Sequence, residues 1–251
     1  MISILILSYN AREYTKHTLK TLRKTKGIDY EVIVLDNASD SKTRRMLVSL
    51  QKKGFIDKLI FEKENTFFAK GNNTASKLCD VNSEYILLLN SDVEIRDSFW
   101  LQKLLKNHKK GATAYGVVNS IIPRADGYCL LIDKELYEKY KLDESYQWWW
   151  SVTKLQGQLL NENYNITAIL SHNNMIFHYG GRSGDAWMNA SGMQTKQEEV
   201  KSWFKHKSAT IIESISGEDG EYNKFALVNI RYVLDKIIKK VTNRVFNFAK
   251  S

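Results

Sequence analysis

Four short apolar runs, separated by amphipathic segments, constrain the fold of this chain most. The runs cover residues 2–7, 31–36, 56–61 and 85–89 and consist mainly of leucine and β-branched residues. Runs of this length are typical of strands that are buried on both faces. Apolar residues at helical spacing predict helices at 13–26 and 41–53, and a polar loop at 65–73 is expected to lead into a short helix that ends near residue 79. This alternation predicts an α/β fold with a mostly parallel central sheet flanked by helices.

Three of the four predicted strands stop at polar clusters. These clusters are Ser8-Tyr9-Asn10, Asp36-Asn37 and Asn90-Ser91-Asp92. Ligands of parallel α/β sheets bind outside the carboxyl ends of the strands. We therefore expect the three clusters to converge on one crevice.

The second half of the chain has a looser pattern. We expect helices at 99–108 and 134–140, strands at 114–119, 128–132 and 166–170, and a loop at 172–184. Trp148-Trp149-Trp150 begins another helix or forms an aromatic cluster. Tryptophans stack on sugar rings when exposed and fill cores when buried, and we expect one of the three to face a binding groove.

Residues 222–248 are expected to form a long amphipathic helix with an apolar stripe and a lysine-rich remainder. An apolar stripe packs against a domain or a second copy of the chain. A basic amphipathic helix also binds an anionic membrane surface. The sequence leaves these three partners open.

Composition narrows the class of protein. The formal net charge is +9, which favours polyanionic partners, but no nucleic-acid-binding module is recognisable, so no nucleic-acid partner is expected. Cys79 and Cys129 are too few for a disulfide framework and wrongly spaced for zinc, which predicts reduced thiols in a cytoplasmic protein. The N-terminus does not resemble a signal peptide, and no apolar run approaches the roughly 20 residues that span a bilayer.

Several polar side chains have two interpretations each. Asn90 and Asp92 would offer oxygen ligands to Mg²⁺ or Mn²⁺ bridging two phosphates, or they would only form a turn or helix cap. Asp36 would accept a hydrogen bond from a base or ribose, or it would cap the next helix. In the loop at 65–73, Lys70 would meet a phosphate and Asn72 would read a base, or the segment is an ordinary turn.

Four segments taken together resemble inverting glycosyltransferase family 2, which has the GT-A fold. They are Ile2–Asn10, Val32–Asp40, Asn65–Ala75 and Ile86–Val93, in the family's order and at ordinary spacing. The similarity continues through Ala125–Ile132 and through His178-Tyr-Gly-Gly-Arg-Ser183, and so covers about residues 1–185.

The resemblance implies a role for each site residue. Ser8, Tyr9, Asn10, Asp36, Lys70, Asn72 and Asn90 would bind the nucleotide, and Asp92 with His178 would hold Mn²⁺ or Mg²⁺. It also implies a UDP- or dTDP-type donor carrying a rhamnosyl, glucosyl, galactosyl or N-acetylhexosaminyl group. The acceptor would be a polysaccharide, lipopolysaccharide or lipid-linked glycan, assembled on the cytoplasmic face of a membrane.

The same resemblance divides the chain into three parts. Residues 1–95 would form the nucleotide-sugar-binding half of the GT-A domain, and residues 96–185 the acceptor-binding half. Residues 186–251 would form a C-terminal helical extension.

One departure from the family concerns the general base, which should be the aspartate of a Glu-Asp pair. Leu142-Asp-Glu-Ser-Tyr146 matches the preceding segment, but Ser151-Val152 stands where the pair belongs. An inverting transfer needs a base to accept the proton of the attacking hydroxyl. Asp143, Glu144 and Asp126 are the candidates.

The sequence leaves two other functions open, a non-catalytic binding protein and a nucleotidyltransferase. Without a base, the protein would bind a nucleotide sugar or glycan and not react. A nucleotidyltransferase shares a related sheet but usually carries a glycine-rich loop after its first strand, and Ser8–Glu13 contains no glycine.

Overall fold

The computed structural model describes residues 1–182, 190–215 and 227–248. The chain divides into two compact units, residues 1–220 and 221–251, which are described separately. The strands are β1 (Ile2–Ser8), β2 (Tyr30–Asp36), β3 (Lys58–Phe61), β4 (Tyr85–Asn90), β5 (Val93–Ile95), β6 (Gly111–Tyr115), β7 (Val117–Val118), β8 (Arg124–Ala125), β9 (Cys129–Asp133), β10 (Asn165–Ser171), β11 (Ile176–His178) and β12 (Thr210–Ser214). The helices are α1 (Arg12–Leu22), α2 (Ser41–Lys52), α3 (Phe67–Ser76), α4 (Trp100–Lys106), α5 (Lys134–Tyr140), α6 (Trp149–Asn161), α7 (Gln197–Phe204) and α8 (Leu227–Phe248).

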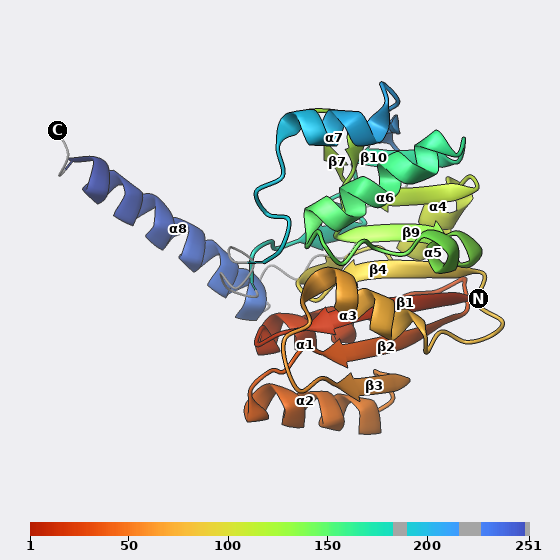
Figure 1. Cartoon of the computed structure of the whole chain (residues 1–251). Helices are drawn as coiled ribbons and strands as arrows, with labels where there is room; N and C mark the ends of the chain where they lie inside the picture. The colour runs from red at the N-terminus through yellow and green to blue at the C-terminus, as the bar shows by residue number, and fades with distance from the viewer. Residues whose placement is uncertain (183–189, 216–226, 249–251) are drawn as a thin grey trace. The chain divides into compact units, whose positions relative to one another are not determined.

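An eight-stranded sheet in the order β12-β10-β6-β9-β4-β1-β2-β3 forms the centre of the first unit (Figure 1). Only β9 runs antiparallel to its neighbours, β4 and β6. Strand β1 pairs with β2 and β4 on its two sides, so that Ser8 lies beside Asp36 and Leu7 beside Asn90. The predicted mostly parallel α/β sheet is confirmed, and its register brings the polar strand ends to one edge.

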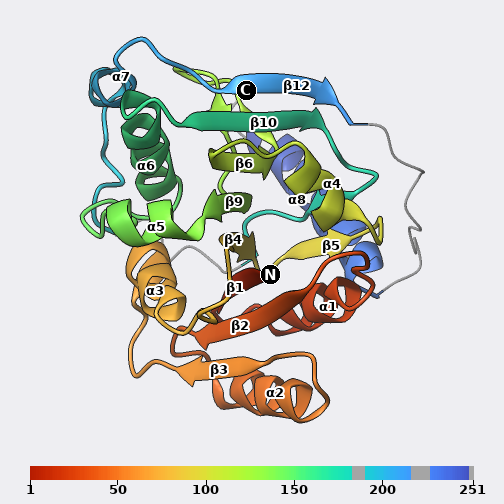
Figure 2. The ribbon, with the colours of Figure 1, turned by 90° about the vertical axis from the view of Figure 1, so that its right-hand side faces the viewer.

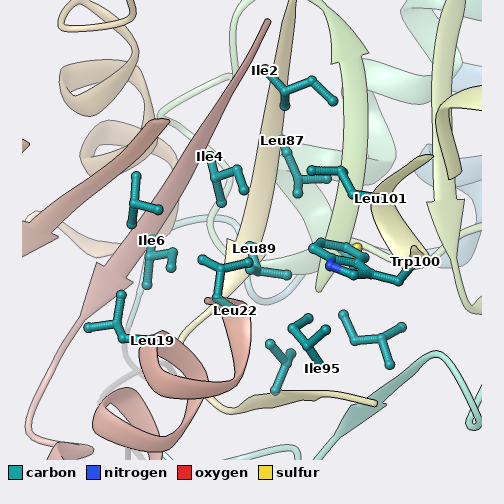
Figure 3. Close-up of a cluster of buried hydrophobic side chains, with 14 of the residues drawn as sticks. Ile2, Ile4, Ile6, Leu19, Leu22, Leu87, Leu89, Ile95, Trp100 and Leu101 are labelled. Carbon is teal, nitrogen blue, oxygen red and sulfur yellow. The ribbon is translucent and has the colours of Figure 1, made fainter. Parts of the chain in front are cut away.

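Two hydrophobic clusters cover the two faces of the sheet. Helices α1, α2 and α4 lie on one side and α3, α5, α6 and α7 on the other (Figure 2). Along β4, Leu87 and Leu89 belong to the first cluster, shown in Figure 3, whereas Ile86 and Leu88 belong to the second. Successive side chains of a strand point to opposite faces, so both must be apolar when both faces are covered. Each such leucine or isoleucine contributes about 1.5–3 kcal/mol through burial.

The predicted polar loop at 65–73 is wrong, because residues 67–76 form helix α3. Gly71 lies within this helix, where it permits close packing and does not form a turn. A Cβ atom at Gly71 would lie 3.0 Å from Cδ1 of Leu7, so glycine lets the helix approach β1. Asn72 does not break the helix because its side-chain amide donates to the carbonyl of Phe68, one turn earlier. Lys70 and Asn72 are therefore helical residues.

The predicted loop at 172–184 is also wrong in part, since it contains β11. This strand pairs antiparallel with β5, with His178 beside Val93. The sequence did not predict β11, because this short strand contains only two apolar residues, Ile176 and Phe177. Its partner β5 lies far away in the sequence. The predicted strand at 114–119 is divided, because Gly116 adopts a φ of 98° between β6 and β7.

The predicted C-terminal extension contains one strand of the sheet. Strand β12 pairs parallel with β10 at the sheet edge. In the second unit, α8 spans most of the predicted helix at 222–248, and residues 222–226 lie outside the described residues. Taken by itself, α8 exposes Ile230, Val233 and Leu234. Among the described residues, no helix has the length and apolarity needed to cross a membrane.

Candidate active site

A cavity of about 250 Å³ opens at the carboxyl edge of the central sheet. Each polar strand end contributes to its lining: Tyr9 after β1, Asn37 after β2, and the segment Asn90–Asp92 after β4. Residues from the second half of the chain close the other side. The convergence expected from topology is present in the structure.

Ser8, Asn10 and Asp36 do not line this cavity. Asn10 lies at the surface, where its side-chain oxygen accepts a hydrogen bond from the backbone of Asp40 at 2.8 Å. Asp36 is fully buried, and its Oδ2 accepts hydrogen bonds from the backbone of Ser39 at 3.1 Å and from Nε of Arg44 at 3.0 Å. In the part of the chain that the structure describes, Asp36 Oδ1 and Ser8 Oγ are buried without a hydrogen-bond partner.

Asp92 and His178, the two predicted metal ligands, lie together in the cavity. Asp92 Oδ1 is 3.2 Å from His178 Nε2, and the side-chain amide of Asn90 is also 3.2 Å from that nitrogen. The imidazole of His178 stacks on the Tyr128 ring at 4.4 Å. Burial by itself would lower the pKa of His178, but the hydrogen bond and charge of Asp92 raise it overall.

This pair fits a metal that is shared with the substrate. The described residues contain no group of three His, Cys, Asp or Glu side chains able to hold a metal ion. Mg²⁺ characteristically takes one or two protein ligands and completes its shell with water and phosphate oxygens. The carboxylate of Asp92 matches that requirement, and the imidazole nitrogen of His178 adds a ligand of the kind that transition-metal ions accept. Asp92 and His178 would be the residues that hold the ion.

Of the three carboxylates predicted as general base, only Asp126 lines the cavity. Asp143 forms an ion pair with Lys154 at 2.5 Å. Burial alone would raise the pKa of Asp143, but the hydrogen bond from Lys154 lowers it overall. Glu144 accepts a hydrogen bond from Asn73 at 3.0 Å. Neither carboxylate lines the cavity.

Val152 lines the cavity where the family's carboxylate pair was expected, and the preceding Ser151 is fully buried. Asp126 reaches the cavity from the short connection between β8 and β9. Its backbone N–H donates to the carbonyl of Gly116 at 3.0 Å, and a Cβ at Gly116 would come within 2.9 Å of the Asp126 Cβ. With a positive φ as well, Gly116 gives Asp126 its place in the cavity.

Helix α3 makes hydrogen bonds to the segment at 142–147 that the sequence did not predict. Asn73 donates to the carbonyl of Leu142 at 2.9 Å and accepts from its N–H at 3.1 Å. Gln147 accepts a hydrogen bond from the backbone N–H of Ala69 at 2.9 Å. Helix α3 thus fixes the segment that leads into the tryptophans. Lys70 is exposed on the same helix, and neither Lys70 nor Asn72 lines the cavity.

Two tryptophans face the cavity and one does not. Trp148 and Trp149 line it, together with Phe67. Trp150 packs against the second hydrophobic cluster, with the guanidinium carbon of Arg124 5.9 Å from its ring. Phe67 and Arg182 were not anticipated as site residues, and both line the cavity.

The fold is that of the GT-A class, with a mostly parallel central sheet flanked by helices. The chain belongs to glycosyl transferase family 2, because the sequence model of that family matches residues 3–180. This membership decides against the nucleotidyltransferase alternative.

Two solved structures share the fold at low sequence identity. The mannosyltransferase PcManGT from Pyrobaculum calidifontis, in complex with GDP-Man and Mn²⁺, is 17% identical with a TM-score of 0.58, over 68% of this chain and 54% of that one. S. aureus TarS 1-349, in complex with UDP, is 17% identical with a TM-score of 0.51, over 62% of this chain and 55% of that one. The match thus spans about half the length of these structures.

A sequence relative is an uncharacterised protein of Haemophilus influenzae. It is 27% identical over 132 residues, which are 50% of this chain and 70% of that protein.

Proposed function

We propose that the protein is an inverting, metal-dependent glycosyltransferase that moves one sugar from a nucleoside diphosphate sugar to a hydroxyl of a surface glycan. The observation that carries this proposal is the meeting of Asp92, His178 and Asp126 at one cavity. A site for diphosphate and a carboxylate for proton transfer are the two requirements of the reaction.

The reaction needs one bond to form as another breaks. The acceptor oxygen attacks the anomeric carbon, and the bond from that carbon to the β-phosphate oxygen breaks, leaving its electron pair on the phosphate. Asp126 accepts the proton of the attacking hydroxyl. Asp92 and His178 would hold the divalent ion, which would supply Lewis-acid stabilisation of the diphosphate.

The donor is proposed from the cavity and from the fold neighbours. TarS was crystallised with UDP, and PcManGT with GDP-Man and Mn²⁺. We propose a UDP- or dTDP-type sugar, with Tyr9 and Asn37 nearest its nucleoside. The buried residues Ser8 and Asp36, which pair in the sheet, directly precede Tyr9 and Asn37 in the sequence.

The acceptor is proposed to enter on the aromatic side of the cavity, along Phe67, Trp148 and Trp149. Aromatic rings stack on the apolar faces of sugars. Most of the donor contacts would then come from residues 1–95 and most of the acceptor contacts from residues 96–185, while Phe67 and His178 would each serve the opposite substrate. The acceptor class would be a polysaccharide or lipid-linked glycan, handled in the cytoplasm near the inner face of a membrane, with α8 as the element that contacts that surface or a second copy.

A transfer assay with a panel of nucleoside diphosphate sugars and Mn²⁺ tests this function. Release of nucleoside diphosphate should depend on the metal, and Asp126→Asn should lower kcat by about 10²- to 10⁴-fold, as expected for loss of a general base. Asp143→Asn and Glu144→Gln are the matched variants and should retain most of the turnover. Equal activity of wild type and Asp126→Asn would show that the base assignment is wrong.

The non-catalytic alternative rests on Val152, the apolar residue at the position expected for the base. The same assay distinguishes this alternative from catalysis. A protein that binds a nucleotide sugar tightly, yet releases no nucleoside diphosphate with any donor and acceptor, would be a binding protein.

A further inference from the structure

We infer that Arg182 is the cation that binds the diphosphate of the donor, in the place that the sequence pattern had suggested for Lys70. This inference rests on the proposed function and names a binding residue within it. Arg182 is the one lysine or arginine among the described residues that line the cavity. Lys70 is exposed on α3 and does not line it.

The charge balance of the cavity calls for such a residue. Asp92 and Asp126 both line it, and a nucleoside diphosphate brings further negative charge. Like charges close together repel strongly in a site that excludes water. A divalent ion held by Asp92 and His178 would offset part of this charge. A guanidinium at the same cavity adds a cation that remains charged at every physiological pH.

The backbone before Arg182 explains how it reaches the cavity. The N–H of Tyr179 donates to the carbonyl of Asp92 at 2.9 Å, which ties the end of β11 to the end of β4. Gly180 and Gly181 follow, with φ values of 66° and 63°, a conformation that glycine adopts without strain. The chain therefore turns directly after the Asp92–His178 pair, and Arg182 follows that turn.

An aromatic support orients the guanidinium. Its carbon lies 5.2 Å from the centroid of the Tyr14 ring, and Tyr14 is only 7% exposed. The Tyr14 ring in turn packs edge-on against Tyr179 at 5.2 Å. A guanidinium over an aromatic face keeps its N–H groups at the rim, where they can donate to two phosphate oxygens at once. Arginine is suited to this contact because its planar fork matches phosphate geometry, whereas lysine offers a point charge.

Binding of nucleotides and their nucleosides separates the phosphate contact from the base contact. Calorimetry with UDP and uridine, and with dTDP and thymidine, is carried out in Mn²⁺ on wild type, Arg182→Gln, Arg182→Lys and Lys70→Gln. Arg182→Gln should weaken binding of the diphosphate by about 10- to 100-fold, the worth of a charge-assisted hydrogen bond, and should leave nucleoside binding unchanged. Arg182→Lys should recover part of the loss, and Lys70→Gln should bind as wild type does.

Arg45→Gln is the matched control for loss of one positive charge, because Arg45 is exposed on α2 and does not line the cavity. Unchanged diphosphate affinity in Arg182→Gln, or an equal loss in Lys70→Gln or Arg45→Gln, would overturn the inference and leave the proposed function standing. Failure of wild type to bind either diphosphate would overturn both. If Arg182→Gln melts at a lower temperature than wild type, the comparison is made with Arg182→Lys, which should still bind the diphosphate less tightly.

Discussion

Phe67 and Trp148 form a pair of aromatic residues that both adopt a positive φ, 59° and 47°, with ring centroids 5.6 Å apart. Phe67 begins α3 and Trp148 directly precedes α6. Bulky residues rarely occupy this region of backbone space, and each instance costs about 1–3 kcal/mol. Such strain is characteristic of functional sites, and here it sets two aromatic rings at the wall of the cavity.

Replacing Trp148 should separate strain from function. Trp148→Gly should be about 1 kcal/mol more stable than Trp148→Ala, because glycine adopts a positive φ without strain. Both variants should raise the acceptor KM by about 10-fold or more through loss of ring stacking and change the donor KM little. Urea unfolding gives the stability difference, and initial rates give the two constants. Equal stability of the two variants would contradict the assignment of strain at Trp148.

Nucleotide binding should depend on a metal ion, and this dependence should require both Asp92 and His178. Asp92→Asn and His178→Gln should each weaken Mn²⁺-dependent nucleotide binding by about 10-fold or more, because each removes a ligand of the shared ion. EDTA should reduce wild-type nucleotide binding to the level of the variants. His206→Gln, at an exposed position, is the control. Nucleotide binding that EDTA leaves intact would count against a metal at this pair.

Asn73 should matter for folding more than its neighbour Asn72. Its side chain makes four hydrogen bonds, to the backbone of Leu142 twice, to Glu144 and to the Tyr137 hydroxyl. Asn73→Ala should therefore cost about 2–4 kcal/mol of unfolding free energy. Asn72→Ala, which loses one hydrogen bond to Phe68, should cost about 1 kcal/mol. Chemical denaturation of both variants measures the two losses of unfolding free energy. A larger loss for Asn72→Ala than for Asn73→Ala would refute this role of Asn73.

Asp133 should make stability depend on acid pH. Burial alone would raise its pKa, but hydrogen bonds from His108 and from the N–H of Gly111 lower it overall. A carboxyl with a lowered folded pKa stabilises the protein fully above its unfolded pKa of about 3.9 and loses that contribution as pH falls through the folded value.

Wild type should accordingly exceed Asp133→Asn in stability at pH 7, and the gap should close as the pH falls below about 4. Urea midpoints of the two proteins between neutral and acid pH measure this gap. A difference that stays constant across the range would exclude titration of Asp133 as its source.

The sequence predicted correctly the features that follow from strand topology. Parallel strands end at one edge, so the polar clusters after β1, β2 and β4 had to meet, and Asp92 was identified on that basis. The prediction was inaccurate where one residue has two local interpretations. Gly71, Asn72 and Asn73 have the composition of a turn, and only packing against Leu7 and the segment at 142–144 makes them helical.

The amino-acid sequence by itself determined the alternating sheet, the family and the edge at which the site lies, because hydrophobic periodicity and strand order are properties of the chain. Tertiary structure decided which side chains enter the cavity. Neighbouring residues of a strand face opposite ways, so Leu7 of β1 lines the cavity while the next residue, Ser8, is buried and does not line it. Asp126 reaches the same cavity from a connection that lies beside Gly116, and Arg182 follows the turn at Gly180 and Gly181, so both positions depend on elements that only the folded chain brings side by side.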